Sequence, residues 1–431
     1  MNIRDRQILS LALPSIVSNI TVPLLGMVDV AIVGHLGDAA YIGAISVGSM
    51  IFNIIYWLFG FLRMGTSGMT SQALGRRDLC EVTRLLIRSA TVGLSVALMI
   101  LMMQHPIRWL AFWLIAPEAE VQTLATTYYH ICVWGAPAML VLYGLTGWYI
   151  GMQNTRFPMV ISIVQNVANI LASFLLVFVF HLEMRGVAIG TIIAQYTGLI
   201  LSLSLLFTNY GKLRKHVVRQ GLFAWDKMLR FFKVNSDIFL RTVCLVAVNL
   251  FFLSAGARQG AVLLAVNTLL MQLYILFSYV MDGFAFAGEA LCGKYYGASN
   301  MTLYRSTIRR LFYWGVMVSL FFTILYIVGG QRFLRLLTDD VAVVHASAAY
   351  FAWAVAIPFA GMAAFVWDGV YIGVTATRWM LWSSVLSSVT FFGVWQAFSP
   401  LWGNHALWLA FILYLMARGV LQTYYYCKGK L

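Results

Sequence analysis

Five carboxylates lie in long apolar stretches of this sequence: Asp29, Asp237, Asp282, Glu289 and Asp368. An acidic side chain at the centre of a membrane-spanning helix costs about 2.5–3.5 kcal/mol on insertion scales, so such residues are rare and usually functional. We therefore treat each of the five as a candidate site for a proton, an inorganic cation or a cationic substrate.

The first of these carboxylates, Asp29, belongs to a polar stripe along one predicted helix. Spacings of four, seven and three residues place the members of the stripe on one helical face. The stripe consists of Ser15, Asn19, Gly26 and Asp29. Pro14 and Pro23 lie in the same helix, and because proline removes a backbone hydrogen bond, we predict that the helix bends near them.

Two further apolar stretches in the N-terminal half carry matching polar stripes. Their residues recur at helical spacings, which again puts each set on one face. The sets are Asn166, Asn169 and Ser173 in one stretch, and Thr191 and Gln195 in the next. We predict that the three stripes converge, with Asp29 binding the proton that couples transport and the amides and hydroxyls orienting it. In the alternative interpretation, Asp29 is a structural carboxylate near a helix end that never titrates.

The C-terminal half distributes its carboxylates differently. Asp237 and Arg241 are one helical turn apart, which is the spacing of a helical ion pair and favours a structural role. Glu289 lies close to the predicted cytoplasmic surface, where water could solvate it. Asp282 and Asp368, together with Asp237 and Glu289, are candidates for binding a cationic substrate or a second ion.

One basic side chain lies in the second apolar stretch. Arg63 occurs in the sequence FLRMGTSG, from Phe61 to Gly68. An arginine at that depth needs either a carboxylate across the transport cavity or a path along which its long side chain reaches the inner membrane surface. The sequence leaves both interpretations open.

The elements that position these residues are predicted to be membrane-spanning helices. Hydrophobic residues make up 61% of the chain and charged residues 10%, whereas a soluble domain has about 25% charged residues. Stretches of about 20 apolar residues can cross the hydrocarbon core. We therefore predict an all-α integral membrane protein with twelve transmembrane helices. The predicted spans are residues 9–33, 42–70, 86–104, 122–146, 157–181, 186–208, 235–257, 262–290, 308–330, 343–368, 379–400 and 405–426.

The Lys and Arg residues set the orientation of these helices. The formal net charge is +14, and with both termini in the cytoplasm 21 of the 29 Lys and Arg residues fall in cytoplasmic segments, in line with the positive-inside rule. The exceptions are Arg108, Arg185, Arg258, Arg332 and Arg335 in outer loops, and Arg63, Arg241 and Arg418 within spans. The longest basic segment, Lys212 to Lys233, is predicted to be a cytoplasmic linker that also touches anionic lipid headgroups. The positive charge therefore indicates contact with membrane lipids and not with nucleic acid.

The sequence contains an internal repeat that relates its two halves. Residues 147–156 read GWYIGMQNTR and residues 369–378 read GVYIGVTATR, with six identical positions. We call the separation of these two motifs along the chain the repeat offset. The first and fifth residues of each motif are glycines, a spacing that lets helices approach closely.

The repeat also predicts the domains and their orientation. Because each half holds six predicted spans, both copies enter the membrane in the same orientation, as in transporters with parallel repeats. The predicted domains are an N-terminal six-helix bundle of residues 1–208, a basic linker of residues 209–234 and a C-terminal six-helix bundle of residues 235–431.

Motifs of enzymes and of metal or cofactor sites are missing from the sequence. Neither HExxH nor GxSxG occurs, and the cysteines form no CxxC pair. The segment GEALCGKY, from Gly288 to Tyr295, lacks the final Ser or Thr of a phosphate-binding loop and lies in a predicted helix. We therefore expect no enzymatic activity, no cofactor, no metal ion and no direct use of ATP.

Several segments resemble the multidrug and toxic compound extrusion (MATE) family, and within it the bacterial DinF branch. They are SNITVPLLGMVDVAIVGHLG from Ser18, FLRMGTSGMTSQA from Phe61, DGFAFAGEA from Asp282, DGVYIG from Asp368 and GNHALWLA from Gly403. The resemblance implies two six-helix bundles in the bacterial inner membrane that export amphipathic, often cationic compounds in exchange for protons or sodium ions. It also implies that Asp29 is the cation-site aspartate and that Asn169 and Thr191 support it.

One departure from the family pattern bears on the coupling ion. DinF-like relatives often have an acidic residue where this chain has Ser173, which leaves one carboxylate in the N-terminal site. A single carboxylate carries one proton but makes a poor sodium site, because hard cations prefer several oxygen ligands. We therefore expect proton coupling, with sodium coupling through the C-terminal carboxylates as the alternative.

A flippase for lipid-linked precursors is the other alternative. A pyrophosphate headgroup calls for several cationic side chains in the transport cavity, whereas the arginines away from the cytoplasmic ends of the predicted spans are only Arg63, Arg241 and Arg418, and the five carboxylates outnumber them. The balance of charges favours a secondary active antiporter for small amphipathic or cationic molecules, working by a rocking motion of the two bundles. We expect this transporter to be a monomer.

Overall fold

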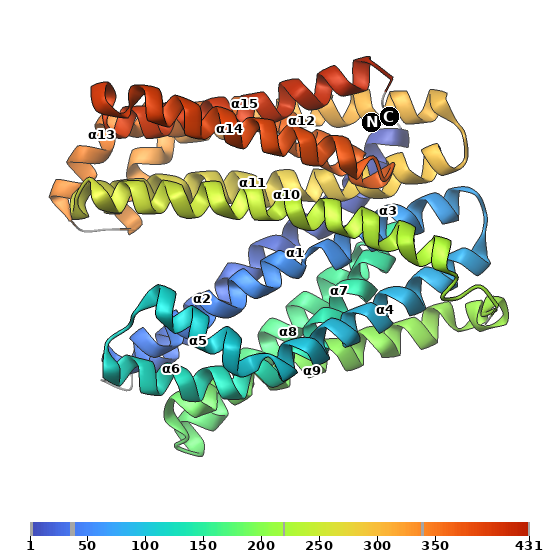
Figure 1. The fold of residues 1–431 in the computed structure, drawn as a ribbon, viewed down its shortest axis with the longest axis horizontal. Helices are drawn as coiled ribbons and strands as arrows, with labels where there is room; N and C mark the ends of the chain where they lie inside the picture. The colour runs from blue at the N-terminus through green and yellow to red at the C-terminus, as the bar shows by residue number, and fades with distance from the viewer. Residues whose placement is uncertain (1–2, 35–38, 219, 338–339, 430–431) are drawn as a thin grey trace. The chain divides into compact units, whose positions relative to one another are not determined.

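The structure is a computed structural model that describes residues 3–34, 39–218, 220–337 and 340–429, without the side chains of residues 22–27, 30, 34, 39, 331 and 336. Every regular element in these ranges is a helix (Figure 1). The helices form two compact units, and each is described by itself. We call Val17–Leu229 the N-terminal unit, and Met1–Ile16 with Arg230–Leu431 the C-terminal unit.

The N-terminal unit begins within α1 (Ile3–Gly34) and ends just inside α10 (Trp225–Arg258). Some of its predicted spans are built from two consecutive helices, joined at Gly60 or through a short 3-10 segment. Its other elements are α2 (Ala39–Phe59), α3 (Phe61–Gly75), α4 (Leu79–Met102), α5 (Gln104–Ile115), α6 (Ala119–Cys132), the 3-10 helix η1 (Val133–Gly135), α7 (Ala136–Gly151), α8 (Arg156–Phe174), the π-helix η2 (Leu175–Val179), α9 (Glu183–Tyr210) and the 3-10 helix η3 (Gly211–His216).

The C-terminal unit is built from six long helices and the start of α1. The six helices are 24 to 37 residues long. At about 1.5 Å per residue, even the shortest exceeds the roughly 30 Å of the hydrocarbon core. They are α10, α11 (Ala261–Gly297), α12 (Met301–Leu337), α13 (Val341–Gly373), α14 (Thr377–Trp402) and α15 (Asn404–Cys427).

The predicted all-α membrane fold is confirmed. Among the described residues, ten helical segments are long and apolar enough to cross a membrane. The remaining two predicted spans correspond to α1 and α14, which are 32 and 26 residues long. The sequence analysis missed α5, a helix of 12 residues that is too short to span. Trp109 and Trp113 on α5 are about two-thirds exposed, as is typical of side chains at a membrane surface.

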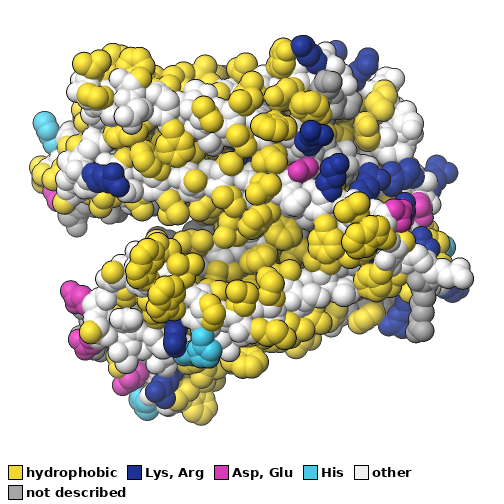
Figure 2. All heavy atoms as spheres, viewed as in Figure 1, with side chains coloured by type: hydrophobic (Ala, Val, Ile, Leu, Met, Phe, Trp, Pro, Cys, Tyr) yellow, Lys and Arg dark blue, Asp and Glu magenta, His cyan; other side chains and the backbone are white. Residues whose placement is uncertain are grey.

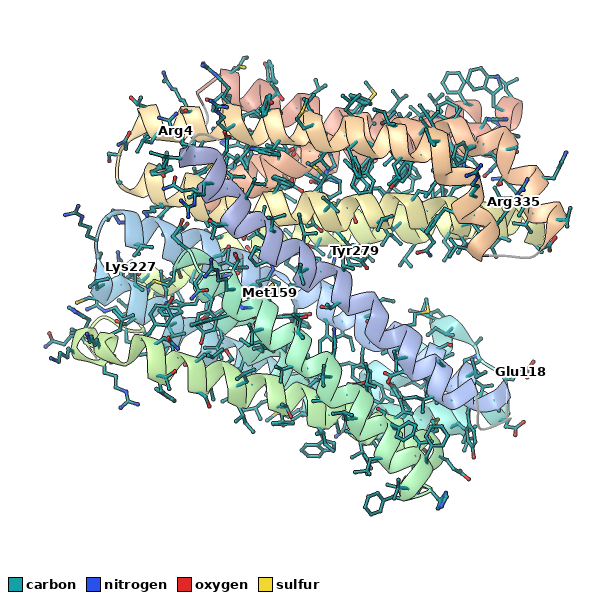
Figure 3. The ribbon with its side chains drawn as sticks, turned by 180° about the vertical axis from the view of Figure 1, so that it is seen from behind. Arg4, Glu118, Met159, Lys227, Tyr279 and Arg335 are labelled. Carbon is teal, nitrogen blue, oxygen red and sulfur yellow. The ribbon has the colours of Figure 1, made fainter. Side chains whose placement is uncertain are left out.

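The surface of each unit has an apolar middle and polar ends. Hydrophobic side chains cover the visible middle, and Lys and Arg gather mostly at one end (Figure 2). In the N-terminal unit, Glu118 and Lys227 lie at opposite ends of the bundle (Figure 3). Arg4 and Arg335 lie at opposite ends of the C-terminal unit (Figure 3). This pattern follows from the low dielectric of hydrocarbon, which excludes charged side chains from the lipid-facing middle.

The units differ from the predicted division at two points. Their second boundary, after Leu229, falls inside the predicted linker, and the start of α1 belongs to the C-terminal unit. Polar contacts hold that start to α12, because the Asp5 carboxylate accepts from the indole of Trp314 (3.2 Å) and lies 3.6 Å from Arg310. These contacts link residues far apart in the sequence, 309 positions in the case of Asp5 and Trp314, which no local pattern reveals.

The helix α1 runs without interruption from Ile3 to Gly34. Pro14 lies within it, two residues before the boundary between the units. Pro23 also lies within α1, but its side chain is outside the described set. The predicted bending at these prolines stays a prediction.

The internal repeat is visible in how the helices pack. A Cβ atom on Gly147 of α7 would lie 2.2 Å from the backbone oxygen of Arg63 on α3. A Cβ atom on Gly369 of α13 would lie 2.3 Å from the backbone oxygen of Ala285 on α11. The repeat offset that relates the two glycines also relates Arg63 to Ala285. One turn further on, the matching contacts are Gly151 with Ser67 and Gly373 with Glu289.

The turns between helices repeat as well. Arg77 and Ser299, which are related by the repeat offset, have φ values of 61° and 56°. Gln153 and Thr375, which are related in the same way, have φ values of 65° and 56°. Left-handed backbone is uncommon outside glycine, so its recurrence at matching non-glycine positions indicates that both copies share one backbone path.

We predict that Gly369→Ala destabilises the protein, because the added methyl group would collide with backbone that cannot rotate away. Overpacking of this kind costs about 1–3 kcal/mol. Thermal unfolding of the purified protein in detergent measures the effect. Gly393→Ala on α14 is the matched control, since a Cβ there meets nothing within 4 Å and alanine favours helix over glycine. Equal melting temperatures for the two variants would contradict the packing argument.

Candidate functional site

Asp29 is buried inside the N-terminal unit near the end of α1. Its side chain is 6% exposed, and its Oδ1 atom has no hydrogen-bond partner among the described residues. Asp29 interacts electrostatically with Tyr128 and Cys132 of α6, which are also buried. A buried carboxylate oxygen without a partner is unusual in a folded protein and is typical of sites that bind an ion or proton.

The polar stripe on α8 contacts both α1 and α9. The Asn166 amide donates to the backbone oxygen of Thr21 on α1 (2.8 Å), and the Thr21 hydroxyl lies 2.9 Å from that of Ser162. One turn further, the Asn169 amide donates to the hydroxyl of Thr191 on α9 (3.2 Å). Hydrogen bonds therefore join α8 to the α9 stripe at Thr191 and to α1 at Thr21, which is not a member of the predicted α1 stripe. Among the described residues, no direct bond joins Asp29 to Asn169.

Ser173 and Gln195 lie where two helices come close together. A Cβ on Gly190 of α9 would lie 2.3 Å from the Ser173 hydroxyl, and one on Gly135 of η1 would lie 1.7 Å from Gln195 Oε1. Neither side-chain oxygen has a hydrogen-bond partner within the described part of the chain, and the same holds for Asn169 Oδ1. The α-helix α8 gives way to the π-helix η2 directly after Ser173 and Phe174, an irregularity frequently found at functional sites.

In the C-terminal unit, Asp368 forms ion pairs with two arginines. Its Oδ2 atom accepts hydrogen bonds from Arg241 of α10 and from Arg418 of α15, the latter at 2.6 Å. The Gln422 amide donates to Oδ1 at 2.8 Å. All four side chains are buried. The cluster carries one net positive charge, so Asp368 is poorly suited to attract a further cation.

The predicted ion pair between Asp237 and Arg241 is wrong. Arg241 pairs with Asp368, and the Asp237 carboxylate accepts a hydrogen bond from the Thr377 hydroxyl instead (2.8 Å). Side chains four residues apart can meet only if both turn toward each other along the helix surface. Here Arg241 is buried whereas Asp237 is half-buried, so the arginine extends into the unit and the carboxylate stays near its edge.

The other candidates take different positions. Glu289 is 1% exposed on α11, so the expectation that water solvates it is wrong in this structure. Asp282 is half-buried on the same helix and interacts electrostatically with Tyr274 and Tyr279. Arg63 is half-buried on α3 and interacts with Tyr143 of α7. The structure does not choose between the two roles considered for Arg63.

Sequence reasoning did not identify Arg418 and Gln422 as partners of Asp368. The signal available was that they lie one turn apart on one span, which puts two polar side chains on the same face.

A second polar cluster was also missed. The Asn267 amide donates to Asn404 (2.8 Å), and both Asn404 and the Trp408 indole donate back to Asn267 Oδ1 (2.9 Å each). This cluster joins α11 to α15 at the segment GNHALWLA.

The chain is similar to known membrane proteins along nearly its whole length. A family model described as MatE matches residues 14–175 and again residues 238–394. The chain is 34% identical over 421 residues to DNA damage-inducible protein F of Escherichia coli (strain K12), covering 96% of this chain and 90% of that protein. It is 26% identical over 352 residues to human Multidrug and toxin extrusion protein 1, covering 78% and 57%.

Solved structures share the fold at low sequence identity. A MATE crystal structure in the bent conformation matches with a TM-score of 0.90 at 16% identity, covering 100% of this chain and 96% of that one. The Vibrio cholerae MATE transporter VcmN in its bent form matches with a TM-score of 0.87 at 17% identity, covering 99% and 97%. Two matches of one family model within one chain agree with the repeat seen in helix packing.

We predict that Asp368→Asn is more destabilising than Arg418→Gln. The first change leaves two buried arginines without a carboxylate partner, whereas the second leaves Asp368 paired with Arg241. Removing one partner of a buried ion pair costs about 3–5 kcal/mol. Denaturant unfolding in detergent micelles would measure both variants against Asp237→Asn, which removes a half-buried carboxylate that has a hydroxyl partner only. An Asp368→Asn protein as stable as Asp237→Asn would refute the role assigned to the cluster.

Proposed function

Because the chain belongs to the MatE family, we propose that it is a secondary active antiporter that exports amphipathic, often cationic compounds in exchange for protons. The name of its human relative, Multidrug and toxin extrusion protein 1, supports the export of drugs and toxins. One observation carries the choice of coupling site. Asp29 keeps a buried oxygen without a partner in the described structure, whereas Asp368 is bound by two arginines.

Asp29 is the proposed proton carrier. In each cycle its carboxylate takes up one proton from the outer side and releases it to the cytoplasm. The polar side chains of α8 and α9 are proposed to orient it, either directly or through water held by their unpartnered atoms. These residues are Asn166, Asn169, Ser173, Thr191 and Gln195. Asp282 is kept as a candidate for the cationic part of the substrate.

Protons suit this site better than sodium ions. Sodium is a hard cation and needs several oxygen ligands with compensating negative charge. The other described carboxylates of the N-terminal unit lie at helix ends or in turns, among them Asp78, which caps α4, and Glu81, which pairs with Arg88. One interior carboxylate is enough for a proton, which needs a single basic oxygen.

The charge pairing also favours an exporter over a flippase of lipid-linked precursors. A flippase needs free cationic side chains for a pyrophosphate headgroup. Of the three intramembrane arginines predicted from the sequence, Arg241 and Arg418 are bound to Asp368. Both guanidinium groups are hydrogen-bonded to Asp368 inside the C-terminal unit, and its carboxylate neutralises one of their two charges.

The proposed setting is the bacterial inner membrane, with both termini in the cytoplasm. The positive-inside rule supports this orientation, because the basic linker between the units and both chain ends are rich in Lys and Arg. The parallel repeat supports alternating access by a rocking motion of the two units, as in other transporters with such repeats.

We predict that Asp29→Asn abolishes transport driven by a pH gradient. Asparagine has nearly the same shape as aspartate but cannot carry a proton. The measurement uses purified protein in sodium-free liposomes, with an imposed pH gradient and ethidium as a fluorescent cation. The wild-type protein should move ethidium, and the variant should behave like protein-free liposomes.

Two controls make this result specific. Asp237→Asn removes a carboxylate from the C-terminal unit and should leave ethidium movement unchanged at equal protein content. A sodium gradient without a pH gradient tests the other ion. Normal movement in Asp29→Asn, or movement only when sodium is added, would contradict the proposal and redirect attention to the C-terminal carboxylates.

A further inference from the structure

The N-terminal unit carries an apolar groove at the end that holds η3. Its volume is about 320 Å³, within the range of small-molecule sites. The helices α4, α7 and α9 form its floor and sides, and η3 with the residue that follows closes one end. Side chains that line it include Leu86, Ile87, Val141, Leu145, Leu203 and Phe207.

Three of the polar side chains that line this groove have their polar atoms hydrogen-bonded within the protein. The Trp148 indole donates to the Val82 carbonyl (2.9 Å), and the Tyr210 hydroxyl accepts from the Asn154 amide (3.2 Å). The Thr83 hydroxyl hydrogen-bonds to backbone carbonyls. The groove therefore offers mainly hydrocarbon to a ligand. Phe207, one of the side chains that line it, is 53% exposed.

The depth of the groove matches one leaflet of a bilayer. Along α4 it extends from Thr83 to Thr91, which is about 12 Å at the helical rise of 1.5 Å per residue. One leaflet contributes about half of the roughly 30 Å hydrocarbon core. The groove starts one turn after the beginning of α4 at Leu79, on the side that the positive-inside rule assigns to the cytoplasm.

The rim of the groove is strongly basic. Arg214 lines it, with the guanidinium carbon 4.8 Å from the centre of the Phe207 ring. Lys212 and Lys215 lie on the same short helix and are exposed, as is Arg214. The segment from Gly211 to Ala224 contains no acidic residue, so nothing in it neutralises these charges.

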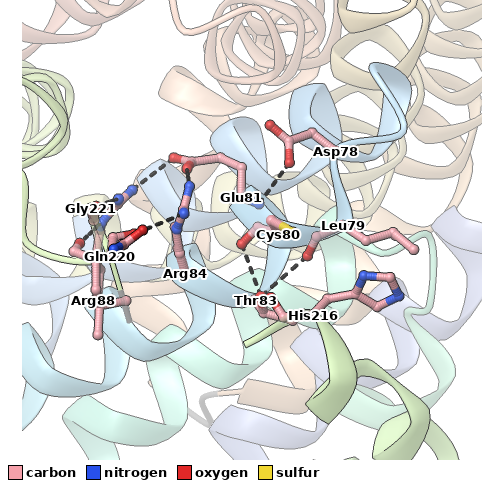
Figure 4. A network of polar contacts seen from close by, with 11 residues as sticks. Asp78, Leu79, Cys80, Glu81, Thr83, Arg84, Arg88, His216, Gln220 and Gly221 are labelled. Atoms are coloured by element: carbon pink, nitrogen blue, oxygen red, sulfur yellow. Dashed lines mark hydrogen bonds and ion pairs between the residues drawn. The ribbon is translucent and has the colours of Figure 1, made fainter. Parts of the chain in front are cut away.

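The wall that carries Arg214 is fastened to α4. Arg84 donates to the backbone oxygen of Gln220 (2.8 Å), and Arg88 donates to that of Gly221 (3.0 Å) and to Glu81 (2.7 Å) (Figure 4). The Thr83 hydroxyl reaches the backbone oxygen of His216 at 3.1 Å (Figure 4). These bonds hold the basic rim in place over the apolar groove and pre-form a site with two chemically distinct parts.

We propose that this groove binds one acyl chain of an anionic phospholipid from the cytoplasmic leaflet, with the lipid phosphate against Arg214. The acyl chain covers the exposed apolar surface, and the phosphate meets the basic residues of η3. A bound lipid would join η3 to α4, α7 and α9 and so stabilise the linker on the N-terminal unit. This site does not depend on the transport mechanism proposed above, because lipid binding is measured without transport.

Native mass spectrometry of the full-length protein in detergent tests the proposal, with dioleoyl phosphatidylglycerol and dioleoyl phosphatidylcholine as probes. Phosphatidylglycerol should bind more tightly, and Arg214→Gln should weaken its binding about fivefold, because one basic residue near an anionic lipid contributes about 1 kcal/mol. Ala90→Phe, which fills the groove without a change in charge, should remove binding of both lipids at this site.

Matched controls separate the groove from general attraction to a basic surface. Lys227→Gln removes one exposed positive charge at the start of α10, outside the groove, and should bind phosphatidylglycerol like the wild type. Inorganic phosphate should not displace the lipid. Equal affinity for the two lipids, an equal loss in Lys227→Gln and Arg214→Gln, an unaffected Ala90→Phe variant or displacement by phosphate would each overturn the proposal.

Discussion

The hydrocarbon core of the membrane imposes the constraint on which the rest of this structure depends, since a polar group placed there must find its partner within the protein. In a helix the backbone amides and carbonyls bond to one another, but each polar side chain needs a partner of its own. Asp368 has partners on both carboxylate oxygens, because Arg241, Arg418 and Gln422 donate hydrogen bonds to it. Asp29 has one oxygen without a hydrogen-bond partner among the described residues. Under the proposed function, this contrast separates a carboxylate that holds helices together from one that exchanges a proton.

The duplication preserves packing and changes chemistry. Backbone contacts at Gly147 and Gly369 recur at the repeat offset, because close approach of two helices leaves no room for another residue. The carboxylate of Asp29 is not repeated. The residue that the repeat offset relates to Asp29 is Phe251, whose ring packs against Phe391 and Phe392. One framework thus supports an acidic interior position in the N-terminal unit and an aromatic cluster in the C-terminal unit.

Local patterns in the sequence were sufficient for the spans, the repeat and the polar stripes, because each depends on spacing along one helix. Partners distant in the sequence could not be predicted in this way. Arg241 had a carboxylate one turn away and pairs instead with Asp368 on another helix, since its burial turns it toward α13 and α15. The helix α5 was not predicted because its 12 residues are too few for a membrane span. The pairing of Asn166 with the backbone of Thr21 likewise depends on how α1 and α8 cross.

The chain passes between its units twice, and both passages lie inside helices, within α1 after Ile16 and within α10 after Leu229. Up to Leu222, the linker is hydrogen-bonded to α4, because Arg84 and Arg88 donate to the backbone oxygens of Gln220, Gly221 and Leu222. The rocking motion proposed above would have to be accommodated where the chain is not so fixed. One such place is α1 near Pro14, where proline leaves a backbone carbonyl without its helical partner and lowers the cost of bending.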